Sequence, residues 1–265
     1  MELNLQDKVI VITGGASGIG RACARHYLEE GGCIAVCGRH ADKLERFREY
    51  CQNAGYKADR VFCGVADVAQ PASLTQFADA VMQRFGRLDI WYNNAAIGVH
   101  KPLLEISLEE WDALMRVNLR AVFFGSRLAA ERMRQGGVIV NASSFAARMP
   151  VAGNGPYAVS KWGVEALTRV LAAELAPRGI RVFAYMPGMI ETDLTRDRIE
   201  RHRKTMVSPI ALQRLGMPDD LAPILVMLTS PLAGYVTGCT VEISGGKFCV
   251  QNPGFAWMSA EERLG

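Results

Sequence analysis

The sequence predicts an α/β protein, a doubly wound parallel sheet of about seven strands with helices on both faces. Short apolar runs rich in β-branched residues alternate along the chain with longer stretches of helical character. The first of these runs leads directly into a glycine-rich turn. No internal repeat and no linker rich in Pro, Gly or Ser divides the chain, so we expect one domain over residues 1–265.

The elements follow one another in a regular order. The first strand is the apolar run Val9-Ile10-Val11-Ile12-Thr13, which is typical of a buried parallel strand. Similar runs predict the other strands, and the set is 9–13, 33–38, 60–65, 88–92, 137–142, 180–186 and 239–243. Helices are expected between them at 18–31, 41–54, 71–85, 108–134, 157–176 and 218–229. Two segments fall outside the alternation, an insertion at 189–217 and a C-terminal tail at 247–265.

Composition restricts the class of protein. With 49% apolar residues, the chain of 265 residues can bury a large core. No apolar run approaches the ~20 residues of a membrane span, and the N-terminus lacks a charged-then-apolar signal, so a cytoplasmic protein is expected. A net charge of +3 gives no reason to expect nucleic-acid binding. The seven cysteines are odd in number and lack C-x-x-C spacing, which favours buried, reduced thiols, and the four scattered histidines suggest no metal site.

The glycine-rich turn after the first strand predicts a phosphate site. Gly14, Gly18 and Gly20 lie between the strand and the next helix. Glycine permits positive φ and lets a phosphate approach the backbone, while the helix N-terminus offers free N–H groups. The spacing G-x-x-x-G-x-G differs from the common G-x-G-x-x-G pattern. The alternative is a tight turn that binds no ligand.

The run Pro156-Tyr157-Ala158-Val159-Ser160-Lys161 predicts a proton-transfer site. Residues four apart share one face of a helix, so the Lys161 ammonium can lie beside the Tyr157 phenol. A free tyrosine has a pKa near 10, which is too high for a proton carrier at neutral pH. A nearby positive charge is therefore expected to lower the pKa of Tyr157.

Together these motifs resemble the short-chain dehydrogenase/reductase family, in its single-domain Rossmann-like form. The resemblance runs from about Leu5 to Gly246. Besides the glycine turn and Tyr157-x-x-x-Lys161, it rests on Asp67, Asn93-Asn94-Ala95, Asn118, Ser143-Ser144, Pro187-Gly188 and Thr192. Three residues depart from the family pattern, namely Ala96, Phe183 and Ser244, and they affect the expected substrate more than the expected reaction.

The resemblance implies a catalytic set of Asn118, Ser144, Tyr157 and Lys161. Tyr157 would exchange a proton with the substrate oxygen, and Ser144 would donate a hydrogen bond to it. Ser143 is a neighbouring candidate, but adjacent strand residues point to opposite faces, and the family spacing selects Ser144. Asn118 would hold a water that passes protons to Lys161. The alternative for Asn118 is an amide bonded to backbone.

The resemblance also implies a set of residues around a nicotinamide nucleotide. Asp67 would accept from the adenine amino group, although a turn cap before Pro71 is an alternative. Asn94 would tie the fourth strand to its neighbour. Thr192 would contact the nicotinamide amide, or else cap the following helix. The full set is Thr13, Gly14, Ser17, Gly18, Ile19, Gly20, Arg39, Asp67, Val68, Asn94, Ala95, Tyr157, Lys161, Pro187, Gly188, Ile190 and Thr192.

The end of the second strand favours NADP(H) over NAD(H). NAD-selective proteins place an acid there, whereas NADP readers use arginine for the 2′-phosphate. Gly38 occupies the acid position and Arg39 follows it. The alternative is that Arg39 is solvated or pairs with Asp42. Ser17 argues against the preference, because many NADP-preferring relatives carry a second basic residue there.

The substrate is less well defined. The run from Pro187 to Thr195 resembles β-ketoacyl-[acyl-carrier-protein] reductases, in which two arginines meet the carrier protein. Arg178 falls at one matching position, and Gln135, next to Arg134, falls at the other. A further basic cluster of Arg196, Arg198, Arg201, Arg203 and Lys204 either supports this contact or is a solvated face. The alternatives are a dehydrogenase of sugars, polyols, steroids or other secondary alcohols, and a cofactor-sensing protein without catalysis.

Assembly is also implied by the resemblance. We expect a homotetramer in which helices 108–134 and 157–176 pack across one two-fold axis and the region from Tyr235 onward packs across another. The tail carries Phe248, Phe255 and Trp257, which are costly to leave in water. The tail is therefore expected to lie along a subunit interface, and a frayed terminus is the alternative.

Overall fold

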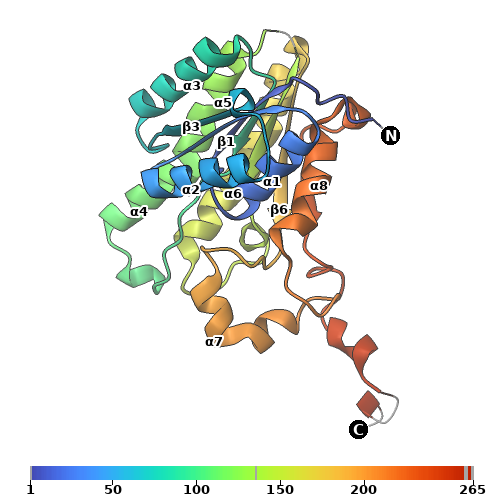
Figure 1. Ribbon diagram of the computed structural model, residues 1–265. Helices are drawn as coiled ribbons and strands as arrows, with labels where there is room; N and C mark the ends of the chain where they lie inside the picture. The colour runs from blue at the N-terminus through green and yellow to red at the C-terminus, as the bar shows by residue number, and fades with distance from the viewer. Residues whose placement is uncertain (1, 135, 260–261, 264–265) are drawn as a thin grey trace.

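The structure is a computed structural model that describes residues 2–134, 136–259 and 262–263 (Figure 1). Its centre is a parallel sheet in the order β3-β2-β1-β4-β5-β6-β7. Every neighbouring pair in this order is parallel, which confirms the predicted fold class. The strands are β1 (Val9–Thr13), β2 (Cys33–Gly38), β3 (Val61–Val65), β4 (Ile90–Asn93), β5 (Gly137–Ala142), β6 (Ile180–Pro187) and β7 (Thr240–Ile243).

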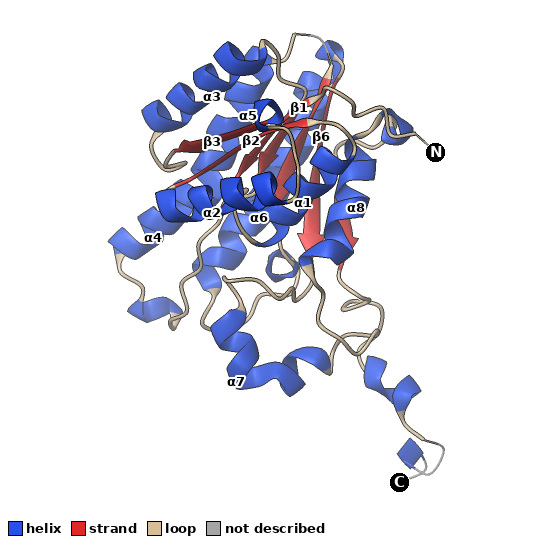
Figure 2. Ribbon diagram, in the orientation of Figure 1, coloured by secondary structure: helices blue, strands red, loops and turns tan. Residues whose placement is uncertain are grey.

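Helices cover both faces of the sheet (Figure 2). One face packs against α1 (Gly18–Glu29), α2 (Ala41–Asn53) and α8 (Pro218–Thr229). The other packs against α3 (Pro71–Phe85), α5 (Ala121–Arg132) and α6 (Gly155–Leu175). Alternate residues of a strand point to opposite faces, so Ile10 and Ile12 of β1 join the first core and Val9 and Val11 join the second.

The long helix expected at 108–134 is interrupted. It consists of α4 (Leu108–Met115), a π-helical turn η3 (Arg116–Arg120) and α5. A π turn widens the helix locally, and such turns are frequent at functional sites. The turn contains Asn118, whose side chain bonds to the backbone of the loop after β4 rather than pointing to solvent.

The segment 189–217 contains a helix that the sequence analysis did not expect, α7 (Arg196–Val207). In Figure 2, α7 lies beyond the carboxyl ends of the strands. It is held by a small apolar cluster of Met189, Ile199, Ile210 and Leu215, separate from the two main cores. The segment is therefore placed over the edge of the sheet where the polar motifs end.

The tail extends away from the sheet (Figure 1). It contains a short 3-10 turn, η7 (Pro253–Trp257), and the Trp257 indole donates to the Ala211 carbonyl at 2.8 Å. Phe255 and Trp257 nevertheless remain 51% and 65% exposed. The cysteines also depart in part from expectation, since Cys239 and Cys249 are exposed. No helix in the described ranges is long and apolar enough to cross a membrane.

Candidate active site

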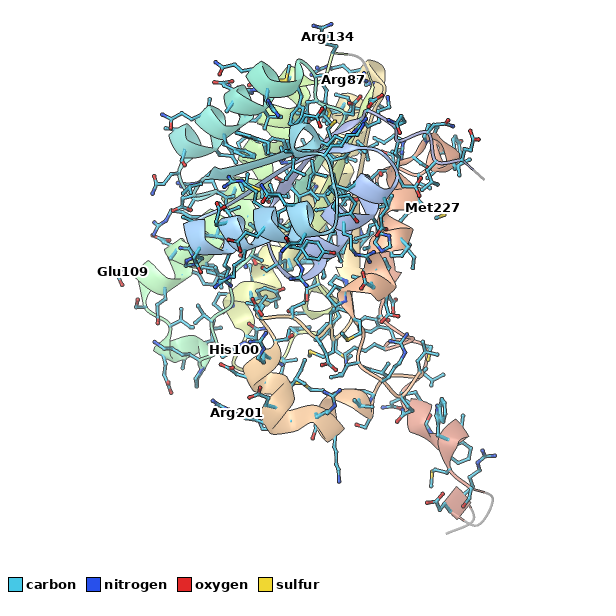
Figure 3. All side chains as sticks on the ribbon, in the orientation of Figure 1. Arg87, His100, Glu109, Arg134, Arg201 and Met227 are labelled. Carbon is cyan, nitrogen blue, oxygen red and sulfur yellow. The ribbon has the colours of Figure 1, made fainter. Side chains whose placement is uncertain are left out.

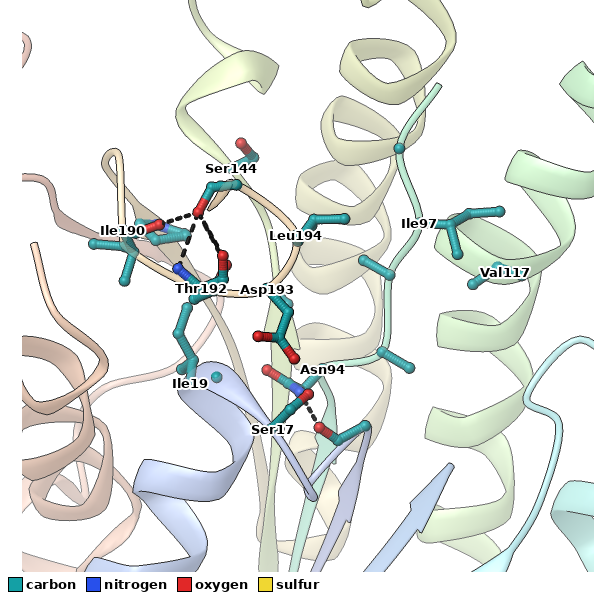
Figure 4. Close-up of a pocket in the computed structure, with 18 of the residues that line it drawn as sticks. Ser17, Ile19, Asn94, Ile97, Val117, Ser144, Ile190, Thr192, Asp193 and Leu194 are labelled. Carbon is teal, nitrogen blue, oxygen red and sulfur yellow. Dashed lines mark hydrogen bonds between the residues drawn. The ribbon is translucent and has the colours of Figure 1, made fainter. Parts of the chain in front are cut away.

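A pocket lies at the carboxyl edge of the sheet, where β1 stands between β2 and β4. The chain direction of the crossovers reverses at this point, and open α/β sheets bind ligands in the crevice so formed. Figure 4 shows Ser17 and Asn94 at one end of the pocket, with Thr192, Ile190 and Ser144 along one side. Ile97 and Val117 lie across from them. The motifs from both halves of the chain therefore line one continuous cavity.

The glycine turn has the geometry that a nucleotide phosphate requires. Gly14 and Gly18 have φ of +67° and +52°, which non-glycine residues rarely adopt. A Cβ at Gly14 would lie 3.2 Å from Ala95 Cα, and one at Gly18 would lie 3.2 Å from Thr192 Cγ2. The turn leads into α1, whose first residues line the pocket. These residues fit a dinucleotide pyrophosphate, because the backbone is open to approach and a helix N-terminus faces it.

Two residues of the predicted nucleotide set do not line the pocket. The Thr13 hydroxyl is buried and donates to the Tyr92 carbonyl at 3.1 Å. Gly20 allows α1 to pack closely, because a Cβ there would lie 2.8 Å from Asn94 Nδ2. Both residues therefore shape the turn from beneath, and only their neighbours reach the cavity.

Asn94 links three strands. Its Nδ2 donates to the Thr13 carbonyl at 2.9 Å, and its Oδ1 accepts from the Tyr185 hydroxyl at 2.8 Å. The bonds join the end of β4 to β1 and β6. The amide thus holds the floor of the pocket, as expected for a residue that ties neighbouring strands, and Asn94 also lines the cavity.

The far end of the pocket is basic. Arg39 is exposed, lines the pocket and makes no ion pair within the described residues. Asp42, its expected alternative partner, pairs with Arg46 at 2.6 Å. Lys43, which the sequence analysis did not single out, also lines the pocket and pairs with Asp193 at 3.2 Å. Gly38 places no carboxylate at this end of the pocket. Space for a side chain is available, because a Cβ at Gly38 would meet nothing within 4 Å.

Asp67 is placed for both of the roles considered for it, a pocket residue and a turn cap. It lines the pocket together with Val68. Its Oδ1 also accepts from the Ala69 backbone N–H at 2.9 Å, as a turn cap does. One carboxylate oxygen is thus used by the turn.

The predicted catalytic side chains converge at the other end of the pocket. Ser144, Tyr157 and Lys161 all line it, and Ser144 and Lys161 are only 5% and 1% exposed. Ser143 points elsewhere, since its hydroxyl donates to Glu165 Oε1 at 3.0 Å. The geometry therefore separates the two serines as the alternation of a strand predicts.

The electrostatics differ from the expectation. Burial raises the pKa of Tyr157, while the Ser144 hydroxyl and the Arg198 charge oppose this rise. The Lys161 ammonium lies 5.6 Å from the centre of the Tyr157 ring and donates to the Ala142 carbonyl at 2.8 Å. Burial lowers the pKa of Lys161 itself to about 8. The net direction is therefore opposite to the expected lowering of the Tyr157 pKa, because burial outweighs the groups that oppose it.

Asn118 lies beneath the pocket rather than in its wall. It is fully buried, accepts from the Ile97 backbone N–H at 2.9 Å and donates to the Ile97 carbonyl at 2.8 Å. Its amide also donates to Ser160 at 3.4 Å. The side chain thus follows the alternative reading of a backbone-bonded amide, and it fixes the loop that carries Ile97.

The segment after β6 closes the pocket from above. Pro187, Gly188, Ile190 and Thr192 all line it. The N-cap of α7 is Thr195, not Thr192, and the Thr195 hydroxyl donates to the Ile190 carbonyl at 2.6 Å. Thr192 is therefore free of the capping role considered for it.

Three polar residues near Tyr157 were not assigned from the sequence as site residues. His100 follows β4, Asn154 precedes α6, and Arg198 lies on α7; all three line the pocket. No motif signals them, because each arrives from a separate loop or helix. Arg198 in particular reaches the pocket only because the segment 189–217 folds over the sheet edge.

Three of the basic residues considered as contacts for a carrier protein already have partners within the chain. Arg178 donates to the carbonyls of Ala130 and Met133 at 2.6 and 3.0 Å. Arg196 pairs with Asp193, and Arg203 pairs with Glu191, each at 2.6 Å. Arg201 and Lys204 are exposed. Gln135 lies outside the described residues.

Known proteins resemble this chain over almost its full length. A family model described as enoyl-(acyl carrier protein) reductase matches residues 14–247. The chain is 36% identical over 246 residues to the 3-oxoacyl-[acyl-carrier-protein] reductase of Thermotoga maritima, which covers 92% of this chain and 99% of that protein. It is 36% identical over 248 residues to 3beta-hydroxysteroid dehydrogenase 1 of Eggerthella lenta, covering 92% and 94%.

Among solved structures, a short-chain type dehydrogenase/reductase from Mycobacterium marinum superposes with a TM-score of 0.89 at 31% identity, covering 94% of this chain and 98% of that one. The two relatives above differ in their named substrates but are equally identical to this chain. Identity alone therefore selects a fold and a reaction class, not a substrate.

Proposed function

Because the chain belongs to the short-chain dehydrogenase/reductase family, oxidoreductases that act on CH–OH or keto groups with NAD(P), we propose that it uses NADP(H) to interconvert a ketone and a secondary alcohol. The observation that carries the proposal is the convergence of Ser144, Tyr157 and Lys161 in a pocket that continues to the glycine turn. A 3-oxoacyl thioester is the specific substrate candidate.

The residues divide the work of the reaction. The nucleotide supplies or accepts hydride when bound. Ser144 donates a hydrogen bond to the substrate oxygen, which stabilises negative charge there during reduction. Tyr157 gives that oxygen a proton in reduction and removes one in oxidation. Lys161, four residues away on α6, keeps a positive charge next to the phenol and binds the nucleotide ribose.

Other residues hold the nucleotide. The glycine turn and the N-terminus of α1 receive the pyrophosphate, and Asp67 and Val68 border the adenine. Pro187, Gly188, Ile190 and Thr192 enclose the nicotinamide. Asn118 acts through the Ile97 loop, which lines the pocket.

The preference for NADP(H) has three supports. Arg39 lines the pocket without an ion-pair partner among the described residues, so its guanidinium is available to a 2′-phosphate. Lys43 adds a second positive charge at the same end. No carboxylate stands at Gly38 to repel the phosphate.

Two classes of substrate have support. A 3-oxoacyl thioester is favoured by the relative named for that activity, and the family model is described by another reductase of acyl-carrier-protein substrates. A secondary alcohol of the sugar, polyol or steroid class is the second candidate. Asn154, His100 and Arg198 add polar groups to a pocket that also has apolar walls, and one relative is named for a steroid substrate.

The assay follows NADPH absorbance with acetoacetyl thioesters, simple diketones, sugars and steroid ketones. Turnover that disappears in the Ser144→Ala variant, while nucleotide binding persists, would support the proposal. Tight nucleotide binding without turnover on any member of this set would instead favour the cofactor-sensing alternative.

A further inference from the structure

The arginines of α7 differ in their surroundings. Arg196 and Arg203 point to the outer surface and pair with acids at 2.6 Å. Arg198 is half-buried, lines the pocket and makes no ion pair or hydrogen bond within the described parts of the chain. The five N–H groups of a guanidinium are strong donors, and those of Arg198 are left open on the pocket side. An acceptor from outside the protein would satisfy them.

The Arg198 charge acts on the reacting groups. It opposes the rise that burial causes in the pKa of Tyr157, and it adds to the lowering that burial causes in the pKa of His100. In Figure 3, Arg201 of the same helix projects outward from the ribbon, and it does not line the pocket. The guanidinium thus belongs to the substrate end of the cavity, near the phenol, and not to the basic end at Arg39.

Asn154 is a second polar group without a partner. It lines the pocket three residues before Tyr157 and is 8% exposed. Its Oδ1 is the buried side-chain atom that lacks any hydrogen bond in the described residues. Although Asn154 is the N-cap of α6, its side chain makes no capping bond. An unsatisfied buried amide costs free energy, so a ligand with a hydroxyl or N–H group would relieve it.

We propose that Arg198 and Asn154 form a subsite for a carboxylate-bearing substrate, so that the enzyme acts on a secondary hydroxy acid or the corresponding oxo acid. The inference rests on the proposed function and selects one class among its polar substrates. Arginine binds a carboxylate through two parallel N–H···O bonds, which a neutral ester or thioester cannot reproduce. The Asn154 amide would accept from a hydroxyl of the same molecule.

The test compares each acid with its neutral counterpart. Acetoacetate, 4-oxopentanoate and a 2-oxo acid would be assayed with NADPH beside their methyl esters and beside acetoacetyl-CoA. For at least one pair, the acid should exceed its ester in kcat/KM by at least ~10-fold, which is the scale of a lost charge-assisted hydrogen bond. Arg198→Gln should remove this preference and leave the KM for NADPH unchanged.

Arg201→Gln is the matched control, since it removes the same charge from an exposed position of α7 that does not line the pocket. It should keep the acid preference. Equal or better turnover of the esters or of acetoacetyl-CoA, unaffected by Arg198→Gln, would overturn the inference. An increased KM for NADPH in Arg198→Gln, with the acid preference intact, would also overturn it by assigning the guanidinium to the nucleotide.

A binding measurement separates this inference from the proposed function. The melting temperature of the protein with NADP⁺ would be titrated with butyrate and with butyramide at constant ionic strength. Butyrate should bind at least ~10-fold more tightly to the wild type, and the difference should vanish in Arg198→Gln. Equal binding of the two probes would refute the subsite even if turnover is found, and a clear preference would uphold it even if turnover is not found.

Discussion

The proposed chemistry depends most directly on the Tyr157 hydroxyl. We predict that Tyr157→Phe lowers kcat at least ~10²-fold, since general acid–base groups contribute about that much. Nucleotide affinity should stay near wild type, because the phenyl ring is kept. Steady-state kinetics and nucleotide titration of both proteins test this. A variant with nearly normal kcat would refute the proton-transfer role.

Nucleotide preference is predicted to depend on two adjacent residues. Arg39→Ala should lower kcat/KM for NADPH roughly 10- to 150-fold and leave kcat/KM for NADH nearly unchanged, because a charge-assisted hydrogen bond is lost. Gly38→Asp should favour NADH, since an added side chain finds open space and its carboxylate repels a phosphate. Gly38→Ala is the control for the added Cβ. The ratio of kcat/KM for the two nucleotides measures each effect, and a wild-type preference for NADH would contradict the argument.

Lys161 should make stability depend on pH. Burial lowers its pKa to about 8, below the value of an unfolded lysine. The unfolded chain therefore binds more protons between about pH 8 and 10.5, so the free energy of unfolding should rise with pH in this window. Below about pH 8 the ammonium is charged in both states, and the cost of burying it is fully present.

The size of this effect is roughly 3 kcal/mol, from a shift of about 2.5 pH units. Urea unfolding of the nucleotide-free wild type and of Lys161→Met, from about pH 7 to 10, would measure it. The wild type should gain stability relative to the variant as pH rises. If the free energy of unfolding changes with pH in parallel for the two proteins, burial of the Lys161 ammonium costs the folded state nothing measurable.

At the scale of elements, Asn118 connects the π-helical turn to the loop after β4. Asn118→Ala would leave the Ile97 N–H and carbonyl without their partners, so we predict a loss of roughly 1–3 kcal/mol in the free energy of unfolding. Because Ile97 lines the pocket, kcat should fall as well.

Ser126→Ala is the matched control for this prediction. Ser126 is a buried hydrogen-bonding residue of α5 that bonds to Asn93 and does not line the pocket. Ser126→Ala should lower the free energy of unfolding with little change in kcat. If Asn118→Ala likewise leaves kcat unchanged, the loop position does not depend on this amide.

The elements were predicted where local pattern determines them. Buried parallel strands such as β1 show an apolar run, and the turn at Gly14 and Gly18 shows its glycines. The π turn at 116–120 has no such signal, because it depends on a hydrogen bond between Asn118 and a loop 21 residues away. Helix α7 is mostly charged and is held by four apolar residues from separated positions, so periodicity does not reveal it.

The site residues, like the elements, were predicted where a local motif marks them. Ser144, Tyr157 and Lys161 belong to one spaced motif and meet in the pocket as the family spacing implies. Thr13 also belongs to a motif, but its hydroxyl is used by Tyr92 beneath the turn. Arg198 could not be found from spacing, because its proximity to Tyr157 depends on how α7 packs. Asn154 lies three residues before Tyr157, but no motif marks it. The residues proposed to carry the reaction are thus visible in the sequence, whereas those proposed to select the substrate are not.

At the scale of the whole molecule, one groove carries several exposed apolar side chains. A groove between η3 and α6 is lined by Met115, Leu119, Phe123, Leu167 and Val170. Phe123 is 48% exposed and Val170 53%. Large exposed apolar patches of this kind mark contact surfaces, and a symmetric copy is the simplest occupant. The observation supports the proposed homo-oligomer, with these helices packing across a two-fold axis.

The tail provides the test of assembly. Phe255 and Trp257 are more than half exposed, although each aromatic side chain can bury ~150–250 Å² when packed. The tail touches its own chain through Trp257 and Ala211, next to Ile210 in the apolar cluster that supports α7. Packing these aromatic residues against a neighbouring subunit would therefore stabilise both the oligomer and the wall of the substrate pocket.

Deletion of residues 250–265 is thus predicted to reduce the mass in solution, lower the melting temperature and raise the KM for the carbonyl substrate. The double variant Phe255→Ala and Trp257→Ala keeps the length of the chain, so it should reproduce the effects if the aromatic groups cause them. Light scattering, thermal unfolding and steady-state kinetics provide the three measurements. If the deletion changes none of them, the tail is a frayed terminus and the apolar groove of η3 and α6 remains the sole basis for assembly.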